Sequence, residues 1–239
     1  MKKKALITGG TSSLGIKTIE EFAKAGYDII FTFISNEVKA KKIIESIKTN
    51  YDINIECKRL DLQRENDIIA LFDGIESLDC LVNNAAYNND CDILEHTKDE
   101  FVKTLEVNLV GPFLMSKYAY KLLSKSKGNI INVASSNGID SMYPDSVDYD
   151  ASKAALINMT KNLMKAFSPQ VRVNAIAPGW IETTKTEDMN PNFRESEINK
   201  IALKRFAMPE EIAKTIIFLA SDDASYINGS IISVDGGRL

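Results

Sequence analysis

A glycine-rich segment near the N-terminus constrains the fold of this chain more than any other feature. The apolar residues 5–7 predict a short buried strand, and residues 14–25 carry the apolar spacing of an amphipathic helix. Between them, residues 8–15 have the sequence Thr-Gly-Gly-Thr-Ser-Ser-Leu-Gly. A strand, a glycine turn and a helix in this order bring backbone N–H groups and the positive end of a helix dipole to a pyrophosphate. The segment therefore predicts a dinucleotide site, and a plain turn between strand and helix is the less favoured alternative.

The rest of the chain alternates between strand-like and helix-like segments. Apolar runs that include β-branched residues predict strands at residues 28–33, 53–59, 80–82, 129–134, 172–176 and 231–234. Helical spacing predicts helices at residues 36–49, 68–72, 98–124, 149–167 and 209–220. Such alternation builds a doubly wound parallel sheet with helices on both faces, and ligands bind at the carboxyl ends of its strands. We therefore expect an α/β fold in which residues 1–239 form a single Rossmann-like domain.

Composition argues against several other classes of protein. Of the 239 residues, 44% are hydrophobic and 26% are charged, which is ordinary for a globular protein. The net charge of −4 gives no reason to expect nucleic acid as a partner, and no apolar stretch approaches the ~18–20 residues of a membrane span. Cys57, Cys80 and Cys91 match no metal-ligand spacing. We expect a cytoplasmic protein with reduced thiols, no metal, and neither nucleic acid nor membrane as a partner.

Tyr149 and Lys153 stand four residues apart in a helix-compatible segment, so their side chains share one face. A tyrosine with its usual pKa of about 10 is a poor base at neutral pH, and a nearby cation favours the phenolate. The pair is a candidate proton-transfer device, although Tyr and Lys at this spacing also occur by chance. Ser135 lies 14 residues before Tyr149, at the end of a predicted strand. Its hydroxyl could donate to a substrate carbonyl, or it could belong to an ordinary Ser/Asn loop.

Together these regions resemble the short-chain dehydrogenase/reductase family. Its pattern is a Thr-Gly-x-x-x-Gly-x-Gly turn, an Asn-Asn-Ala-Gly strand end, a catalytic Ser, and Tyr-x-x-x-Lys. The resemblance covers essentially the whole chain and includes Val-Asn-Asn-Ala-Ala at 82–86, Val-Asn-Leu at 107–109, Val-Asn-Ala-Ile-Ala-Pro-Gly at 173–179 and Val-Asp-Gly-Gly at 234–237. The C-terminal half is most similar to bacterial 3-oxoacyl-[acyl-carrier-protein] reductases. The resemblance implies an NAD(P)-dependent oxidoreductase that interconverts a carbonyl and a secondary alcohol by hydride transfer.

The resemblance also implies a catalytic tetrad of Asn108, Ser135, Tyr149 and Lys153. Tyr149 would exchange a proton with the substrate oxygen, and Ser135 would polarise that oxygen. Lys153 would lower the pKa of the tyrosine and hold the nicotinamide ribose. Asn108 would anchor a water between Lys153 and solvent, or it could be a polar residue that bends its helix. Ser136 is a minor rival of Ser135, because Ser135 stands one residue further from Tyr149 than the closest relatives lead us to expect.

Cofactor contacts implied by the resemblance lie at or just after the predicted strand ends. Asp61 would meet the adenine, and as an Asx residue it could also cap a helix. The expected set is Gly9, Thr11, Ser12, Ser13, Leu14, Asp61, Leu62, Asn84, Ala85, Ala86, Tyr149, Lys153, Pro178, Gly179, Ile181 and Thr183. Ser13 and Ala86 replace glycines of the family pattern, and both substitutions put cofactor affinity rather than cofactor use in doubt.

The choice between NADP and NAD depends on the end of the second predicted strand. This strand ends in Phe-Ile-Ser-Asn at residues 33–36, without the acid that binds a ribose 2′-hydroxyl and repels a 2′-phosphate. Ser35, Asn36 and Lys39 could accept a 2′-phosphate, although the glycine turn lacks the basic residue that many NADP-dependent members carry. On the missing acid we favour NADP over NAD.

Substrate and partners follow from the resemblance and remain open. A 3-oxoacyl reductase acts on a β-ketoacyl thioester borne by an acidic carrier protein, for which Lys121, Lys125 and Lys127 could form a docking patch or only a solvated face. A sugar, polyol or other small-alcohol dehydrogenase is the alternative, and a non-catalytic nucleotide-binding protein is a remote one. Residues 183–205 are expected to cover the substrate as a lid that includes Met189, Pro191 and Phe193, with Trp180 just before it.

The segments 98–124 and 149–167 carry apolar residues on more than one stripe, whereas a helix that faces only its own sheet needs one. In the first segment one side is formed by Phe101, Leu105, Leu109 and Phe113, and the apolar surface is widened by Val102, Leu114 and Tyr118. The surplus, together with the resemblance, predicts a homotetramer with self-complementary interfaces.

Overall fold

The computed structural model describes residues 2–140 and 143–238. Within them, parallel strands form one sheet in the order β3-β2-β1-β4-β5-β6-β7. The strands are β1 (Lys4–Ile7), β2 (Asp28–Phe33), β3 (Ile55–Arg59), β4 (Cys80–Asn83), β5 (Asn129–Val133), β6 (Arg172–Pro178) and β7 (Ile231–Val234). The strand order reverses between β1 and β4, and ligands of such sheets bind in the crevice at this switch point. The predicted α/β, doubly wound parallel fold is confirmed.

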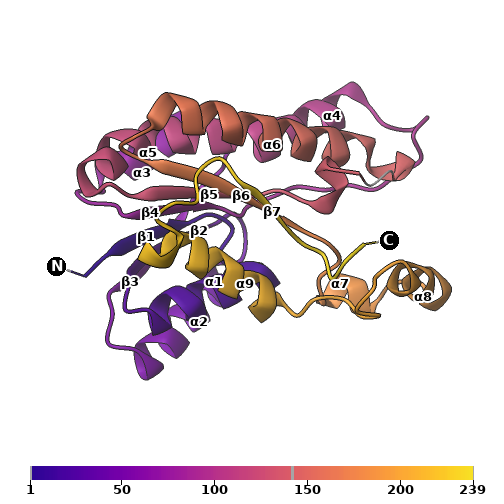
Figure 1. The fold of residues 1–239 in the computed structure, drawn as a ribbon, viewed down its shortest axis with the longest axis horizontal. Coiled ribbons are helices and arrows are strands. Elements are labelled where there is room, and N and C mark those ends of the chain that lie inside the picture. The colour runs from indigo at the N-terminus through magenta and orange to yellow at the C-terminus, as the bar shows by residue number, and fades with distance from the viewer. Residues whose placement is uncertain (1, 141–142, 239) are drawn as a thin grey trace.

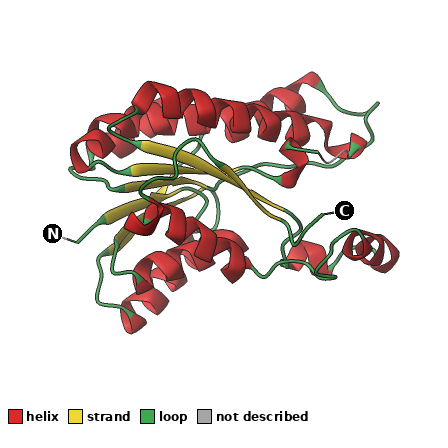
Figure 2. Cartoon of the chain, viewed as in Figure 1, coloured by secondary structure: helices red, strands yellow, loops and turns green. Residues whose placement is uncertain are grey.

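Helices cover both faces of the sheet (Figure 1). One face carries α1 (Ser13–Lys24), α2 (Glu37–Asn50) and α9 (Pro209–Ala220). The other carries α3 (Glu65–Asp73), α4 (Lys98–Leu105), α5 (Gly111–Ser126) and α6 (Val147–Phe167). The short helices α7 (Thr184–Glu187) and α8 (Pro191–Asn199) project beyond the carboxyl ends of the strands, on the same side as the C-terminus (Figure 2).

Alternate residues of the central strands enter two different cores, which explains their continuous apolar runs. In β2, Ile29 and Phe31 pack in the core beneath α1, α2 and α9, whereas Ile30 packs in the core beneath α3, α5 and α6. All three side chains are at most 3% exposed. In β1, Leu6 likewise lies in the second core, between neighbours that lie in the first.

Some boundaries differ from the predicted ones. Strand β3 begins at Ile55 rather than at residue 53, and α3 is longer than the predicted 68–72. The predicted helix 98–124 is divided by a π-helical turn at Glu106–Val110. Gly111 N–H donates to Glu106 O, five residues back, and Pro112 has no N–H with which to continue the normal ladder.

Helices α7 and α8 were not predicted, because their apolar residues follow no clear period. Their starts nevertheless have recognisable caps. Asn190 accepts from the N–H groups of Asn192 and Phe193, and Pro191 occupies the first turn of α8. Thr183 caps α7 in the same way, through Thr186 N–H.

Candidate active site

The glycine turn joins β1 to α1 at the carboxyl edge of the sheet, and its glycines leave no room for a side chain. Gly9 has a φ of +68°, and a Cβ on it would lie 2.8 Å from Ala85 Cα. A Cβ on Gly15 would collide with the Gly9 carbonyl oxygen. Ser12 caps α1: its Oγ accepts from Gly15 N–H at 3.0 Å and donates to Gly9 O at 2.9 Å. The N–H groups of Ser13 and Leu14, the first of α1, make no described hydrogen bond and remain available to a pyrophosphate.

A polar cluster ties the end of β4 to this turn. Thr8 Oγ1 accepts from the N–H groups of Asn84 and Ala85, each at 3.0 Å. Asn84 Nδ2 donates to Thr8 O at 2.8 Å and to Gly9 O at 3.1 Å. These bonds hold the two segments that would contact the adenosine together without a ligand. Thr8 was missed as a site residue, although it is the first residue of the Thr-Gly turn and directly follows a buried strand.

Ser13 is the first residue of α1, next to the N–H groups that a pyrophosphate would contact. We expect Ser13→Gly to tighten cofactor binding or leave it unchanged, because glycine removes a side chain from the path of the backbone. A fluorescence titration with NADPH measures this. The control Ser12→Ala removes the α1 cap and should cost about 0.5–2 kcal/mol of stability. A large loss of NADPH affinity in Ser13→Gly would show that the Ser13 hydroxyl binds a phosphate instead.

Helix α6 presents Tyr149 and Lys153 near the carboxyl end of β5. Lys153 Nζ lies 5.4 Å from the centre of the Tyr149 ring. Lys153 is only 2% exposed, and its Nζ donates to Val133 O at 2.8 Å. Gly138 permits this packing, since a Cβ on it would lie 2.6 Å from the carbonyl carbon of Lys153. An ammonium has three donors, and within the described residues Lys153 uses one, so two remain for ribose hydroxyls.

Burial shifts both members of this pair toward their neutral forms. Desolvation lowers the pKa of Lys153 to about 7. Desolvation also raises the pKa of Tyr149 to about 12, against the opposing effect of a hydrogen bond with the Ser135 side chain. A buried cation without a carboxylate partner is costly. Ligand hydroxyls that accept from Lys153 would stabilise its charged form, and that charge would in turn favour the Tyr149 phenolate.

Ser135 is the hydroxyl that the structure brings to Tyr149. It is 9% exposed, and its Oγ also accepts from Asn137 N–H at 3.2 Å. Ser136 is 3% exposed and begins the short turn Ser136–Gly138. The groups that shift the pKa of Tyr149 include the Ser135 side chain and not that of Ser136, which favours Ser135 as the catalytic hydroxyl.

Asn108 lies in the π-helical turn and is fully buried. Its Oδ1 accepts from Tyr87 N–H at 2.7 Å. Its Nδ2 donates to Tyr87 O at 2.8 Å and to Ser152 Oγ at 3.0 Å. Asn108 therefore connects the loop after β4 to α6, one residue before Lys153, and the bulged helix is what turns its amide inward.

The predicted adenine contact at Asp61 lies at the carboxyl edge, but the helix-cap alternative for it is wrong. Arg64 is the N-cap of α3, and Asp61 instead closes a turn before it. Asp61 Oδ1 accepts from Gln63 N–H at 3.1 Å, and Asp61 O accepts from Arg64 N–H at 3.1 Å. The neighbouring Leu62 is 7% exposed, so mainly its backbone is available to a ligand.

The predicted nicotinamide contacts follow β6. Pro178 ends that strand, and a Cβ on Gly179 would lie 3.0 Å from Asp235 Cα. Ile181 pairs with Ala207 in an isolated bridge. Thr183 then caps α7, so its hydroxyl is partly engaged by its own helix.

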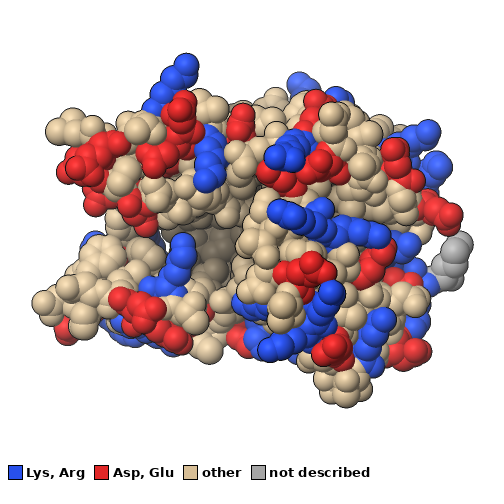
Figure 3. Space-filling view, turned by 180° about the vertical axis from the view of Figure 1, so that it is seen from behind, with Lys and Arg blue, Asp and Glu red and all other residues tan. Residues whose placement is uncertain are grey.

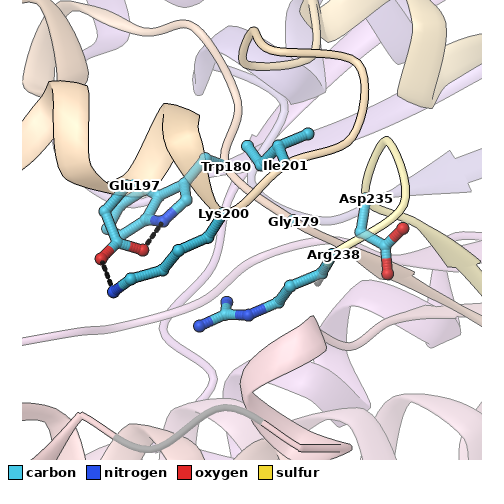
Figure 4. A pocket seen from close by; sticks show the side chains of 7 residues that line it. All are labelled: Gly179, Trp180, Glu197, Lys200, Ile201, Asp235 and Arg238. Carbon is cyan, nitrogen blue, oxygen red and sulfur yellow. Dashed lines mark hydrogen bonds and ion pairs between the residues drawn. The ribbon is translucent and has the colours of Figure 1, made fainter.

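The segment 183–205, which is expected to form a lid, contains a buried carboxylate, Glu197, that was not predicted as part of the site. Glu197 is 1% exposed and accepts from Trp180 Nε1 at 3.0 Å and from Lys200 Nζ at 2.5 Å (Figure 4). It also accepts from the Tyr143 hydroxyl. Arg238 Nη2 donates to that same hydroxyl at 3.1 Å. Although desolvation opposes ionisation, hydrogen bonds from Lys200, Tyr143 and Trp180 hold the pKa of Glu197 below its usual value. The network joins the loop before α6, the lid and the C-terminal segment.

Aromatic rings complete this region. Trp180 stacks on Phe206 with ring centres 5.6 Å apart and meets Phe193 and Tyr143 edge to face. Seen from behind, a deep hollow lies between the lid and the layer of α4 and α6, with uncharged side chains on its floor (Figure 3).

Lys121, Lys125 and Lys127 do not lie near this site. Helix α5 runs antiparallel to the strands and ends just before β5 begins, so these lysines lie toward the amino edge of the sheet. The expectation that they form a docking patch beside the crevice is therefore wrong.

The described residues hold no group of three or more His, Cys, Asp or Glu side chains that could bind a metal ion. None of the helices described in residues 2–140 and 143–238 is long and apolar enough to cross a membrane.

Comparison with known proteins agrees with this geometry. The family model described as enoyl-(acyl carrier protein) reductase matches residues 9–238. The 3-oxoacyl-[acyl-carrier-protein] reductase of Aquifex aeolicus is 36% identical over 98% of this chain and 96% of its own length. The corresponding reductase of Rickettsia felis is 37% identical, over 99% and 97%.

A solved structure gives the same result. A mutant of a short-chain dehydrogenase/reductase from Serratia marcescens matches with a TM-score of 0.91 and 26% identity, over 98% of this chain and 97% of its own. The family model, the two reductases and the solved structure thus all match nearly the whole of this chain. The chain belongs to the short-chain dehydrogenase/reductase family and is an NAD(P)-dependent oxidoreductase.

Proposed function

We propose that this protein is a cytoplasmic 3-oxoacyl-[acyl-carrier-protein] reductase that uses NADPH to convert a β-ketoacyl thioester to the 3-hydroxyacyl form. The observation that carries the reductase chemistry is the buried Lys153, which lies beside Tyr149 and has donors left for a ligand. The choice of substrate is supported by relatives of this name at 36–37% identity over nearly their full length.

The residues of the crevice fit a nicotinamide cofactor. The close contact of Gly9 with Ala85 brings the glycine turn against the end of β4, and Lys153 has unused donors for the ribose. The bound nicotinamide would supply the hydride. Tyr149 would then donate its phenolic proton to the substrate oxygen as negative charge develops there, and Ser135 would donate a hydrogen bond to the same atom.

Lys153 would act on this proton transfer through its charge. Once its ammonium is stabilised by ligand hydroxyls, it lowers the energy of the Tyr149 phenolate that remains after the proton has left. The lid would exclude water, since Trp180 and Phe206 present an apolar surface that Glu197 holds in place. The role of Asn108 as anchor of a water that resupplies the proton remains a prediction.

A substrate panel tests the proposal. Purified protein is mixed with NADPH or NADH and one candidate substrate, and the absorbance at 340 nm measures oxidation of the cofactor. The substrates are an acetoacetyl thioester of N-acetylcysteamine, the same acyl group on a carrier protein, and simple keto sugars. We expect the carrier-bound β-ketoacyl group to be reduced fastest. Turnover of keto sugars without turnover of either thioester would instead favour the small-alcohol dehydrogenase. Binding of cofactor without any turnover would favour the non-catalytic alternative.

We also propose a homotetramer, for which an apolar groove between α5 and α6 is the support. The groove is lined by Leu109, Val110, Phe113, Ala155, Asn158, Met159 and Asn162. Val110 and Phe113 are each 43% exposed there, whereas Leu114, which was expected to widen the outer surface, is 9% exposed and packs in the core. A helix stripe of this kind is suited to a symmetry-related copy.

Phe113→Glu is expected to dissociate the assembly, because a charge would be buried at the interface. Light scattering at micromolar concentration should report a tetramer for the unmodified protein and a smaller species for the variant. Val38→Glu is the matched control, since Val38 is 67% exposed on α2, away from the groove. A wild-type protein that is a stable and active monomer would refute the tetramer.

A further inference from the structure

The end of β2 faces the place where the adenosine ribose lies in folds of this class. Gly10 N–H donates to Thr32 O at 2.8 Å, which fixes the end of β2 beside the glycine turn. Beyond Phe33 the chain continues through Ile34 and Ser35, and no acid stands there to bind a ribose 2′-hydroxyl. The strand end therefore lacks the group that selects against a 2′-phosphate.

A cation from the neighbouring strand fills this position. β3 pairs with β2 in parallel, with Arg59 opposite Phe33. Arg59 Nε donates to Ile34 O at 3.1 Å, so the guanidinium is held across the end of β2. Its Nη groups make no described hydrogen bond to the protein.

Arg59 also points to the side of the sheet on which α2 begins. Ile55 and Cys57 stand at every second position before Arg59 on β3, so all three side chains lie on the same face of the strand. Ile55 and Cys57 pack in the core on the α2 face. The charge of Arg59 contributes to lowering the pKa of Glu37, the first residue of α2, after the larger effect of Lys41. The guanidinium therefore lies near the N-terminus of α2, where helix-end N–H groups also favour an anion.

No carboxylate neutralises Arg59 within the described residues. Glu37 is paired with Lys41 at 2.7 Å, and none of the ion pairs found within 4 Å includes Arg59. An arginine that is tethered through one nitrogen and keeps its other donors free is suited to a phosphate, which a guanidinium binds through two parallel hydrogen bonds.

We propose that Arg59 is the residue that recognises the 2′-phosphate of NADPH and so determines the cofactor preference. The inference rests on the proposed NADPH-dependent function. It assigns to β3 the cation that the glycine turn lacks, since Ser12 and Ser13 stand in that turn without a basic side chain. Ser35 and Lys39, which follow β2, are auxiliary donors in this arrangement.

Isothermal titration with 2′,5′-ADP and 5′-AMP tests the proposal, since the two ligands differ by the 2′-phosphate alone. The wild-type protein should bind 2′,5′-ADP more tightly. Arg59→Gln should weaken the binding of 2′,5′-ADP by about 10–100-fold, the range for a charge-assisted hydrogen bond. The affinity for 5′-AMP should stay unchanged. Arg59→Lys keeps the charge without the planar fork and should give an intermediate loss.

Lys58→Gln is the matched control. Lys58 precedes Arg59 on the same strand, points to the opposite face and pairs with Glu56 at 3.0 Å. It should change neither affinity, and thermal unfolding should confirm that all three variants fold. Equal affinity of the wild-type protein for both ligands, or equal weakening of both by Arg59→Gln, would overturn the assignment. Failure of the wild-type protein to bind either ligand would overturn the proposed function itself.

Discussion

Replacing Tyr149 with phenylalanine is expected to lower turnover by about 10²–10⁴-fold, the usual contribution of a general acid, while NADPH still binds. Only the hydroxyl is removed, so the packing of α6 and the backbone of the glycine turn stay intact. Within the described part of the site no other acid is placed beside Ser135, whose side chain opposes the rise in the pKa of Tyr149. Steady-state kinetics at 340 nm and a fluorescence titration with NADPH separate the two effects.

Tyr226→Phe is the control for Tyr149→Phe. Tyr226 is fully exposed after α9, and removal of its hydroxyl should change neither turnover nor affinity. If Tyr149→Phe retained turnover within a few-fold of the wild-type value, the proton donor would have to be sought elsewhere.

Lys153→Met is expected to abolish most turnover and yet to make the ligand-free protein more stable at neutral pH. Burial lowers the pKa of Lys153 in the folded state from 10.5 to about 7, so protonation of this residue opposes folding. Between pH 7 and pH 10.5, the two pKa values, the unfolded chain binds more protons than the folded chain. The contribution of Lys153 to the free energy of unfolding therefore rises with pH in this range. Below pH 7 both states are protonated and the full penalty applies.

Methionine has a similar length and carries no charge, so the variant should lose this part of the pH dependence. Urea unfolding at pH 7 and at pH 9.5 measures the free energy of unfolding of the variant and of the wild-type protein. The difference between these two free energies should be larger at pH 7. Lys161→Met, on the exposed side of α6, is the control and should leave the pH dependence unchanged. A variant that is less stable than the wild-type protein at pH 7, or a difference that does not vary with pH, would contradict this view of Lys153.

The fold and much of the crevice could be predicted from local patterns. Strands such as Ile29–Phe31 are buried on both faces, so their composition alone indicates a covered parallel sheet. Gly9 and Gly15 are required by contacts within the turn itself or with the adjacent strand end. Tyr149 and Lys153 share a helix face because they stand four residues apart.

Features that depend on distant partners could not be predicted. The Glu197 network unites residues from the loop before α6, from the lid and from the C-terminal segment, with Tyr143 and Arg238 95 positions apart. The π-helical turn around Asn108 depends on a shift in the backbone ladder before Pro112, which side-chain periodicity does not report. The distance of Lys121 from the crevice follows from the direction of α5 relative to the strands, which the composition of that helix does not report.

The most direct test of a carbonyl reductase in this crevice is a stoichiometric reaction. The wild-type protein is incubated with NADPH and an acetoacetyl thioester, and both NADPH consumption and the 3-hydroxybutyryl product are measured in the same sample, with Tyr149→Phe in parallel. We expect one 3-hydroxyacyl product for each NADPH oxidised, and almost none with the variant. NADPH that binds but is not oxidised by the wild-type protein with this thioester or with any other carbonyl compound would contradict the account.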